Sequence, residues 1–274
     1  MSVNYFERFN LKGKNAIVTG GAGILGSYFC KGLADAGAQV AVVDINIEEA
    51  TKVAEQIIVD YNTTAKAFYC DLTSEESVKQ MVQAVVEEFG EINILHNNAA
   101  GKSSNLAAFF APFEDYDLNQ WKEIMSTNLD SMFLVAKYVG KVMKEQNKGG
   151  SIIQTSSIYG VMGPDNRIYE GSNYLERQIN TPAIYSASKA GVVGLTKYLS
   201  TYWAKDGIRV NTITPGGVES GQNDTFKQNY SNRIPLGRMA QPEEMIGALI
   251  YLASDAASYV TGQNIIIDGG LSAW

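Results

Sequence analysis

The chain has 274 residues, and its 22 Lys and Arg against 29 Asp and Glu give a formal net charge of −7. An acidic chain without a run of basic residues is a poor candidate for binding nucleic acid or an anionic membrane surface. No apolar stretch approaches the ~20 residues that a membrane span requires, and the first residues lack the apolar core of a signal peptide. A single histidine and two cysteines at no metal-binding spacing predict no metal site. We therefore expect a cytoplasmic protein.

Apolar, strand-like runs alternate with segments of helical periodicity along the whole chain. The predicted strands are Asn15–Thr19, Gln39–Val43, Lys66–Cys70, Ile92–His96, Ser151–Thr155, Ile208–Ile213 and Asn264–Ile267. The predicted helices are Ala22–Ala36, Ile47–Tyr61, Ser74–Phe89, Leu118–Gln146, Tyr185–Lys205 and Pro242–Leu252. Apolar strands separated by helices predict an α/β fold with a parallel sheet covered on both faces. No linker or repeat divides the chain, so we expect a single domain over residues 1–274.

Glycines cluster directly after the first strand, where Thr19–Gly26 reads T-G-G-A-G-I-L-G. Glycines at this place allow a tight turn and let a pyrophosphate approach the N-terminus of the next helix, whose free N–H groups favour anions. The segment predicts a dinucleotide site. The alternative is a plain turn between a strand and a helix.

Two carboxylates follow the second and third strands. Asp44 lies 24 residues beyond Gly20, where a carboxylate accepts hydrogen bonds from the hydroxyls of an adenosine ribose. It would repel a 2′-phosphate, and no Arg or Lys stands at 22–25 or 45–49 to receive one, so the sequence predicts NAD over NADP. The alternative for Asp44 is a helix N-cap. Asp71 either binds the adenine amine or caps the next helix.

Tyr185 and Lys189 stand four residues apart in the segment Y-S-A-S-K, so on a helix their side chains share a face. A cation within ~4–6 Å lowers the pKa of a phenol, which is otherwise near ~10. A tyrosine tuned in this way takes a proton from an alcohol or returns one to a carbonyl. Decoration of a helix surface is the alternative for so short a motif.

Seven motifs in a fixed order resemble those of one family. They are the glycine turn, N-N-A-A-G (97–101), S-T-N-L (126–129), S-S-I-Y-G (156–160), Y-S-A-S-K (185–189), R-V-N-T-I-T-P-G-G-V-E-S (209–220) and I-D-G-G (267–270). Together they resemble the short-chain dehydrogenase/reductase family in its shorter, common branch, and look most like gluconate 5-dehydrogenase-like and bacterial glycan-sugar oxidoreductases. The resemblance implies a Rossmann-type, doubly wound sheet of seven parallel strands in the order 3-2-1-4-5-6-7, a nicotinamide cofactor, and a homotetramer or homodimer. The cofactor half would span about residues 12–150 and the catalytic half about 151–274.

The resemblance also implies roles for single residues. Tyr185 would be the acid/base acting on the substrate oxygen, and Ser157 would position that oxygen. Lys189 would lower the pKa of Tyr185 and bind the nicotinamide ribose, and Asn128 would hold a water that links Lys189 to solvent. The implied cofactor-binding residues, besides Tyr185 and Lys189, are Gly20, Gly23, Ile24, Leu25, Gly26, Asp44, Ile45, Asp71, Leu72, Asn98, Ala99, Ala100, Pro215, Gly216, Val218 and Ser220.

The chain departs from the family pattern at three places. Ile24 stands where the shorter branch has its middle glycine, and the glycine spacing 20, 23, 26 is that of the longer branch that modifies sugar nucleotides. Ala100 replaces a glycine. Ser157 and Tyr185 are 28 residues apart, farther than is usual, because of an insertion at about residues 161–181.

The insertion is the main indication of the substrate, because it leaves the end of the fifth strand, where open α/β sheets place their ligands. Residues 221–233 are expected to form a lid helix beside it. A solvated flap or a subunit contact is the alternative for the insertion. Its side chains able to pair with hydroxyls or a carboxylate are Asp165, Asn166, Arg167, Glu170, Asn173, Arg177 and Gln178. The predicted substrate-binding residues are Tyr159, Asp165, Arg167 and Gly217.

These observations predict an NAD(H)-dependent oxidoreductase that acts on a secondary alcohol or ketone of a sugar, sugar acid or polyol. Neither a nucleic acid nor a membrane is an expected partner. Two alternatives remain at this point. One is a sugar-nucleotide epimerase or dehydratase with bound NAD, suggested by the glycine spacing, and the other is a non-catalytic NAD-sensing protein on the same fold.

Overall fold

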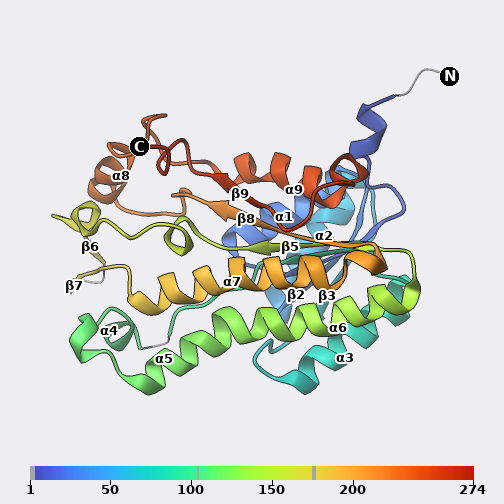
Figure 1. Ribbon diagram of the computed structural model, residues 1–274, viewed down its shortest axis with the longest axis horizontal. Helices are drawn as coiled ribbons and strands as arrows, with labels where there is room; N and C mark the ends of the chain where they lie inside the picture. The colour runs from blue at the N-terminus through green and yellow to red at the C-terminus, as the bar shows by residue number, and fades with distance from the viewer. Residues whose placement is uncertain (1–3, 104, 175–176) are drawn as a thin grey trace.

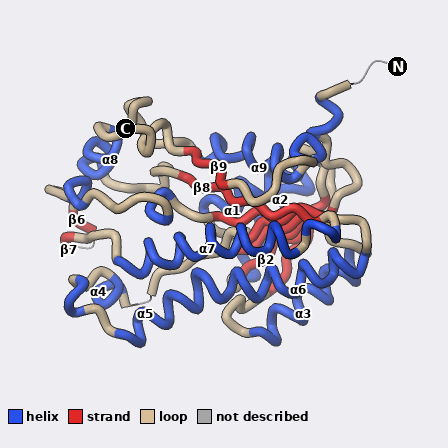
Figure 2. The backbone as a smooth tube through the Cα atoms, viewed as in Figure 1, coloured by secondary structure: helices blue, strands red, loops and turns tan. Residues whose placement is uncertain are grey.

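A seven-stranded parallel sheet lies at the centre of the computed structural model, which describes residues 4–103, 105–174 and 177–274 (Figures 1 and 2). The strand order is β3-β2-β1-β4-β5-β8-β9. Numbered along the chain within this sheet, the order is 3-2-1-4-5-6-7, so the predicted Rossmann-type topology is confirmed. The strands are β1 (Asn15–Thr19), β2 (Gln39–Asp44), β3 (Ala65–Tyr69), β4 (Ile94–Asn97), β5 (Gly150–Thr155), β8 (Ile208–Pro215) and β9 (Asn264–Ile267).

Helices cover both faces of the sheet, which explains why its central strands are buried along their length. Every residue of β1 and of β4 is buried. One face packs against α1 (Ile24–Asp35), α2 (Ile47–Tyr61) and α9 (Ile246–Ala253). The other face packs against α3 (Glu75–Phe89), α6 (Ser131–Gln146) and α7 (Ala183–Tyr202). Burial on both sides is the arrangement that a doubly wound sheet requires.

The single long helix predicted over 118–146 is divided in the structure. It consists of α5 (Leu118–Met125), a π-helical turn at Ser126–Asp130, and α6. The π-turn inserts one extra residue into the helical path, and such turns are frequent at functional sites. Asn128 lies in this turn and is fully buried.

Segments outside the sheet gather at the end of the molecule where the strands terminate. The insertion forms a 3-10 turn (Asn166–Tyr169) and a short antiparallel pair, β6 (Asn173–Tyr174) and β7 (Arg177–Gln178). The sequence did not predict this pair. The helix predicted within 221–233 is α8 (Asp224–Ser231), and Figure 1 shows α8, β6, β7 and α4 (Leu106–Phe109) at the same end.

Among the residues described, no helix combines the length and the apolar character needed to cross a bilayer. The same residues contain no group of three His, Cys, Asp or Glu side chains arranged to hold a metal ion. Cys30 and Cys70 are both free thiols in the interior.

Candidate active site

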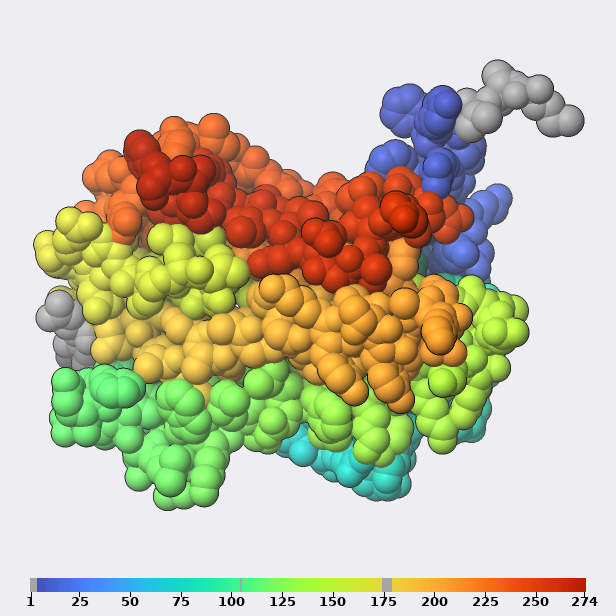
Figure 3. Space-filling model, viewed as in Figure 1, coloured from blue at the N-terminus to red at the C-terminus, as the bar shows by residue number. Residues whose placement is uncertain are grey.

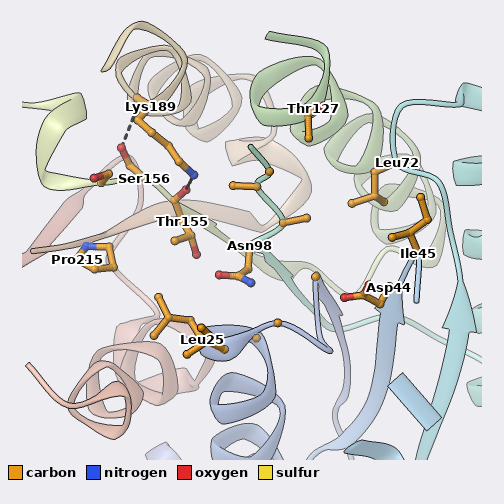
Figure 4. A pocket seen from close by; sticks show the side chains of 18 of the residues that line it. Leu25, Asp44, Ile45, Leu72, Asn98, Thr127, Thr155, Ser156, Lys189 and Pro215 are labelled. Carbon is orange, nitrogen blue, oxygen red and sulfur yellow. Dashed lines mark hydrogen bonds between the residues drawn. The ribbon is translucent and has the colours of Figure 1, made fainter. Parts of the chain in front are cut away.

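A cavity of about 770 Å³ opens at the carboxyl ends of the central strands (Figure 4). Figure 4 shows Asp44 and Leu72 at one end of it, with Lys189 and Pro215 at the other. The structure brings every predicted cofactor-binding residue to this cavity, including Tyr185 and Lys189. Further lining residues, outside the predicted cofactor-binding set, are Cys70, Thr73, Gly101, Thr127, Thr155, Ser156 and the predicted catalytic residue Ser157.

The glycine turn forms the floor of this cavity with backbone atoms. Gly20 has a φ of +64°, a conformation that favours glycine. A Cβ at Gly26 would lie 1.9 Å from the carbonyl oxygen of Gly20, so only glycine lets α1 start this close to β1. Gly23 is the N-cap of α1 and offers no side-chain cap. The first N–H groups of α1 therefore have no partner within the helix and can bind an anion.

Ile24, which replaces the family's middle glycine, does not fill the turn. Its side chain is 56 % exposed and lines the cavity. The spacing 20, 23, 26 thus leaves an open cradle of the kind that a pyrophosphate needs. The residues of the turn fit a dinucleotide.

The carboxylate of Asp44 ties the glycine turn to the end of β2. Its Oδ2 accepts a hydrogen bond from the backbone N–H of Ala22 at 3.0 Å, and its Oδ1 accepts one from Asn46 at 2.9 Å. The N-cap of α2 is Asn46, whose side chain accepts from the N–H of Glu49. Asp44 lines the cavity, so the simple N-cap alternative does not describe it.

Asp71 at the end of β3 has a similar position. Its Oδ1 accepts hydrogen bonds from the backbone N–H and the hydroxyl of Thr73. The N-cap of α3 is Ser74, which accepts from the N–H of Ser77. Asp71 also lines the cavity and is therefore placed to meet a ligand there.

The side chains of Tyr185 and Ser157 lie beside each other, and both residues line the cavity. Burial raises the pKa of Tyr185, and the hydroxyl of Ser157 only partly opposes this shift. The direction is opposite to the one predicted from Lys189, because removing the phenolate from water outweighs the stabilisation it receives. The phenol is therefore protonated at neutral pH.

Lys189 is fully enclosed beside this pair. Its Nζ donates a hydrogen bond to the carbonyl oxygen of Thr155 at 3.1 Å, and burial lowers the pKa of Lys189 to about 8. The carbonyl oxygen of Lys189 in turn accepts from the hydroxyl of Ser156 at 2.7 Å. These contacts fix α7 against the end of β5.

Asn128 lies in the π-turn, and of its two side-chain amide atoms the oxygen has a hydrogen-bond partner. Its Oδ1 accepts a hydrogen bond from the backbone N–H of Gly101 at 2.8 Å. Its Nδ2 is buried and has no partner within the described part of the chain. A buried donor without a partner is costly, and a bound water would satisfy it. The water relay implied by the family fits this geometry and stays a prediction.

His96 lies beneath the site, in the interior. Its Nε2 is 2.8 Å from the hydroxyl oxygen of Thr155, and its ring packs edge-on against Phe29 with centroids 4.2 Å apart. Burial lowers the pKa of His96 to about 3, so the ring is neutral. His96 supports the end of β5 and is not among the residues that line the cavity.

A second cavity, of about 700 Å³, joins the first at Tyr185 and Ser157. Two of the predicted substrate-binding residues, Tyr159 and Gly217, line it. Its wall also includes residues outside the predicted substrate-binding set of Tyr159, Asp165, Arg167 and Gly217. They come from the loop after β4, from the insertion and from the α8 region, and include Lys102, Phe110, Tyr169, Asn180, Asn223 and Tyr230. What these residues have in common in the sequence is that they lie in the segments that follow β4, β5 and β8.

The other two predicted substrate-binding residues are placed elsewhere. Asp165 and Arg167 do not line the second cavity. Arg167 is 78 % exposed and forms a bidentate ion pair with Asp165, whose carboxylate also contacts Arg233. A carboxylate with two arginine partners has little capacity left for a ligand. The side chains of Arg177 and Gln178 lie outside the described part of the structure.

The fold and this arrangement of side chains define a class, the Rossmann-type α/β oxidoreductases. A family profile described as enoyl-(acyl carrier protein) reductase matches residues 21–272. The chain belongs to the short-chain dehydrogenase/reductase family.

The curated relatives include oxidoreductases of sugars and polyols. The chain is 36 % identical to a D-threitol dehydrogenase of Mycolicibacterium smegmatis, with 96 % of this chain and 94 % of the relative covered. It is 35 % identical to a sorbose reductase of Candida albicans, with 97 % and 90 % covered.

Solved structures show the same similarity. A gluconate 5-dehydrogenase from Burkholderia cenocepacia, in complex with NADP and tartrate, superposes with a TM-score of 0.86 at 30 % identity, covering 99 % of this chain and 100 % of that one. An NAD⁺-bound xylitol dehydrogenase superposes with a TM-score of 0.83 at 30 % identity, covering 95 % and 99 %. The cofactors named for these two proteins differ, so similarity alone does not decide between NAD and NADP.

Proposed function

We propose that this protein is an NAD(H)-dependent oxidoreductase that interconverts a secondary alcohol and a ketone of a sugar, sugar acid or polyol. The observation that carries the proposal is the meeting of two large cavities at Tyr185 and Ser157. One cavity has a dinucleotide-type glycine turn, and the other has a wall in which aromatic and aliphatic side chains alternate with hydroxyl and amide groups. A proton-transferring side chain at their junction suits a reaction between a cofactor and a small substrate.

The residues of the larger cavity fit a nicotinamide dinucleotide, from the adenosine at one end to the nicotinamide at the other. Asp44 would accept hydrogen bonds from the adenosine ribose, and the N-terminal N–H groups of α1 would bind the pyrophosphate. Tyr185 and Lys189 would bind the nicotinamide ribose, with Val218 near the carboxamide. When bound, the nicotinamide accepts or donates a hydride.

The chain's own part in the reaction is positioning and proton transfer. Ser157 orients the substrate oxygen beside the hydroxyl of Tyr185. Because burial raises the pKa of Tyr185, the phenol is ready to donate a proton during ketone reduction at neutral pH. Alcohol oxidation needs the phenolate, so its rate is expected to rise with pH toward the raised pKa.

The preference for NAD depends on Asp44. A 2′-phosphate would meet this carboxylate, and among the described lining residues of the cavity Lys189, at the opposite end, is the one cation. Repulsion without a compensating cation disfavours NADP. Relatives of both kinds are known, so this assignment rests on the chain's own charges.

The substrate class is supported by the second cavity and by the relatives. Its wall carries hydroxyl and amide groups together with aromatic rings, and Lys102 is its one charged side chain among the described residues. Such a wall suits a polyhydroxylated molecule. The relatives named above act on threitol and sorbose, which are molecules of this kind. The homotetramer or homodimer implied by the family remains a prediction.

The test is a steady-state assay of NADH and NADPH absorbance with a panel of hexoses, sugar acids and polyols. We expect turnover with NAD, and a loss of about 10²- to 10⁴-fold in kcat for Tyr185→Phe. Tyr198→Phe is the matched control, because Tyr198 lies on the same helix but is 63 % exposed. It should change kcat less than about twofold.

Two outcomes would contradict the proposal. Cofactor that co-purifies in stoichiometric amount, with no net NADH formation, would favour a sugar-nucleotide epimerase or dehydratase. A Tyr185→Phe variant that retains function in cells would favour a non-catalytic, NAD-sensing protein.

A further inference from the structure

Two segments far apart in the sequence form one unit over the second cavity. We call residues 165–173 the insertion arm and residues 223–233 the α8 segment. The amide Nδ2 of Asn223 donates to the hydroxyl of Ser172 at 2.9 Å, and that of Asn229 donates to the carbonyl oxygen of Glu170 at 2.9 Å. Figure 3 shows the two segments as a continuous surface at this end of the molecule.

Aromatic side chains join the same two segments on their inner side. Tyr169 of the arm packs against Phe226 of α8 with ring centroids 5.5 Å apart, and Phe226 packs against Tyr230 at 5.6 Å. All three rings line the second cavity. The inner face of this unit is therefore a wall of the cavity.

An ion pair lies directly behind that wall. The Asp165 carboxylate contacts the guanidinium of Arg233, and their side chains are 16 % and 33 % exposed. A small pocket is lined by Asp165 and Arg233 together with Tyr159 and Tyr230, and both tyrosines also line the second cavity. Asp165 itself does not line the second cavity, but its partner Arg233 is hydrogen-bonded through the backbone to Tyr230, which does.

The two arginine partners of Asp165 have different surroundings. Arg233 ends the α8 segment, whereas Arg167 belongs to the arm itself and extends into solvent. The hydrogen bonds from Arg167 and the charge of Arg233 hold the pKa of the Asp165 carboxyl well below its usual range. Asp165 is therefore ionised over the whole working pH range, and its contact with Arg233 connects the arm to α8.

We propose that Asp165 is a positioning residue that, through Arg233, holds the α8 segment in place as the distal wall of the substrate cavity. It replaces the role in substrate binding that the sequence suggested. The identity of the molecule that binds in the cavity rests on the proposed function. The link from Asp165 through Arg233 to the α8 segment does not. Since the link lies away from Tyr185 and Ser157, it governs how well the substrate is held and leaves the proton transfer unchanged.

The decisive variants distinguish the contact of Asp165 with Arg233 from its contact with Arg167. For Arg233→Gln and for Asp165→Asn we expect a rise of about five- to tenfold in the substrate KM, because a smaller fraction of molecules has the wall in place, with kcat nearly unchanged. Arg233→Lys retains the charge and should recover most of the affinity. Arg167→Gln is the matched comparison, since it removes the exposed partner only, and KM should change less than about twofold.

A second measurement does not depend on finding a substrate. Hydrogen exchange of the α8 amides should become at least about fivefold faster in Asp165→Asn and Arg233→Gln, but not in Arg167→Gln, while exchange in β1 and β4 stays the same. Faster exchange in a protein inactive on every tested substrate would support the link and count against the proposed function.

Two results would overturn the inference. A larger KM effect for Arg167→Gln than for Arg233→Gln would mean that Asp165 and Arg167 bind the substrate themselves. Unchanged α8 exchange in Arg233→Gln would mean that the ion pair does not hold the segment.

Discussion

The two cavities that meet at Tyr185 are built from different parts of the chain. The larger cavity is lined mainly by turns that follow strands, and Gly20, Gly23 and Gly26 contribute backbone atoms to it. The second cavity is formed by side chains from segments far apart, including Phe110 of the loop after β4 and Tyr230 of α8. Strand ends are set by the sheet, while the packing of long loops depends on which side chains meet.

The difference teaches where substitutions should act. In the larger cavity an added Cβ meets the backbone, which cannot move without disturbing the sheet. In the second cavity a neighbour is a side chain on a loop or a short helix, which can shift. The predictions below test this contrast, in order of decreasing effect.

Asp44→Asn should reduce the preference for NAD over NADP by about 10- to 100-fold in kcat/KM, because a charged hydrogen-bond acceptor is worth about 1.5–3 kcal/mol. The amide oxygen of Asn can still accept from a backbone N–H, so the turn should stay folded. Assays with both cofactors measure the ratio. Glu48→Gln, on the exposed first turn of α2, is the control. An unchanged ratio in Asp44→Asn would remove Asp44 from cofactor selection.

Gly26→Ala should affect the larger cavity, and Gly217→Ala should affect the second one. At Gly26 the new Cβ would lie 1.9 Å from a backbone oxygen, and we expect a loss of about 1–3 kcal/mol in the free energy of unfolding together with weaker NAD binding. At Gly217 it would lie 2.3 Å from the ring of Tyr230, so the substrate KM should rise while NAD binding is retained.

Chemical denaturation and NAD titration measure both effects. Gly247→Ala, on α9 with nothing within 4 Å of the added Cβ, should be neutral or slightly stabilising. If Gly217→Ala weakened NAD binding as much as Gly26→Ala does, the contrast between the two walls would not hold.

His96 should make the protein less stable as the pH falls. Its pKa is lowered from 6.5 to about 3 in the folded state, so the unfolded chain takes up a proton below pH 6.5 that the folded chain does not. The free energy of unfolding should therefore decrease by ~2 kcal/mol between pH 7 and pH 5. His96 is the chain's single histidine, so His96→Gln should remove most of this slope in denaturation curves. If the free energy of unfolding of His96→Gln fell equally with pH, carboxylates and not His96 would cause the decrease.

The sequence predicted the fold and the larger cavity well, for a physical reason. A parallel sheet with short turns places the residue after each strand at one edge, so Gly20, Asp44 and Asp71 had to come together once the strands were recognised. The central strands follow from runs that are buried on both faces, such as β1 and β4. The predicted cofactor-binding residues all line one cavity in the structure.

The sequence predicted the pKa values and the partners of ionisable side chains less well, because these depend on burial as well as on charge. From spacing alone, Lys189 was expected to lower the pKa of Tyr185, but the structure buries the phenol and raises that pKa. From composition alone, Asp165 and Arg167 were expected to bind the substrate, but they pair with each other and with Arg233. Polar residues in an insertion satisfy one another first, and sequence does not show which partners they meet.

The parallel sheet, the glycine turn and the residues at the strand ends can be read from the sequence, because these depend on local periodicity and on residues within one β-turn-α unit. The distal wall of the second cavity cannot be read from it. That wall depends on contacts such as the one between Asp165 and Arg233, which are 68 residues apart. Contacts at such separations depend on the packing of the whole chain, which no local pattern encodes.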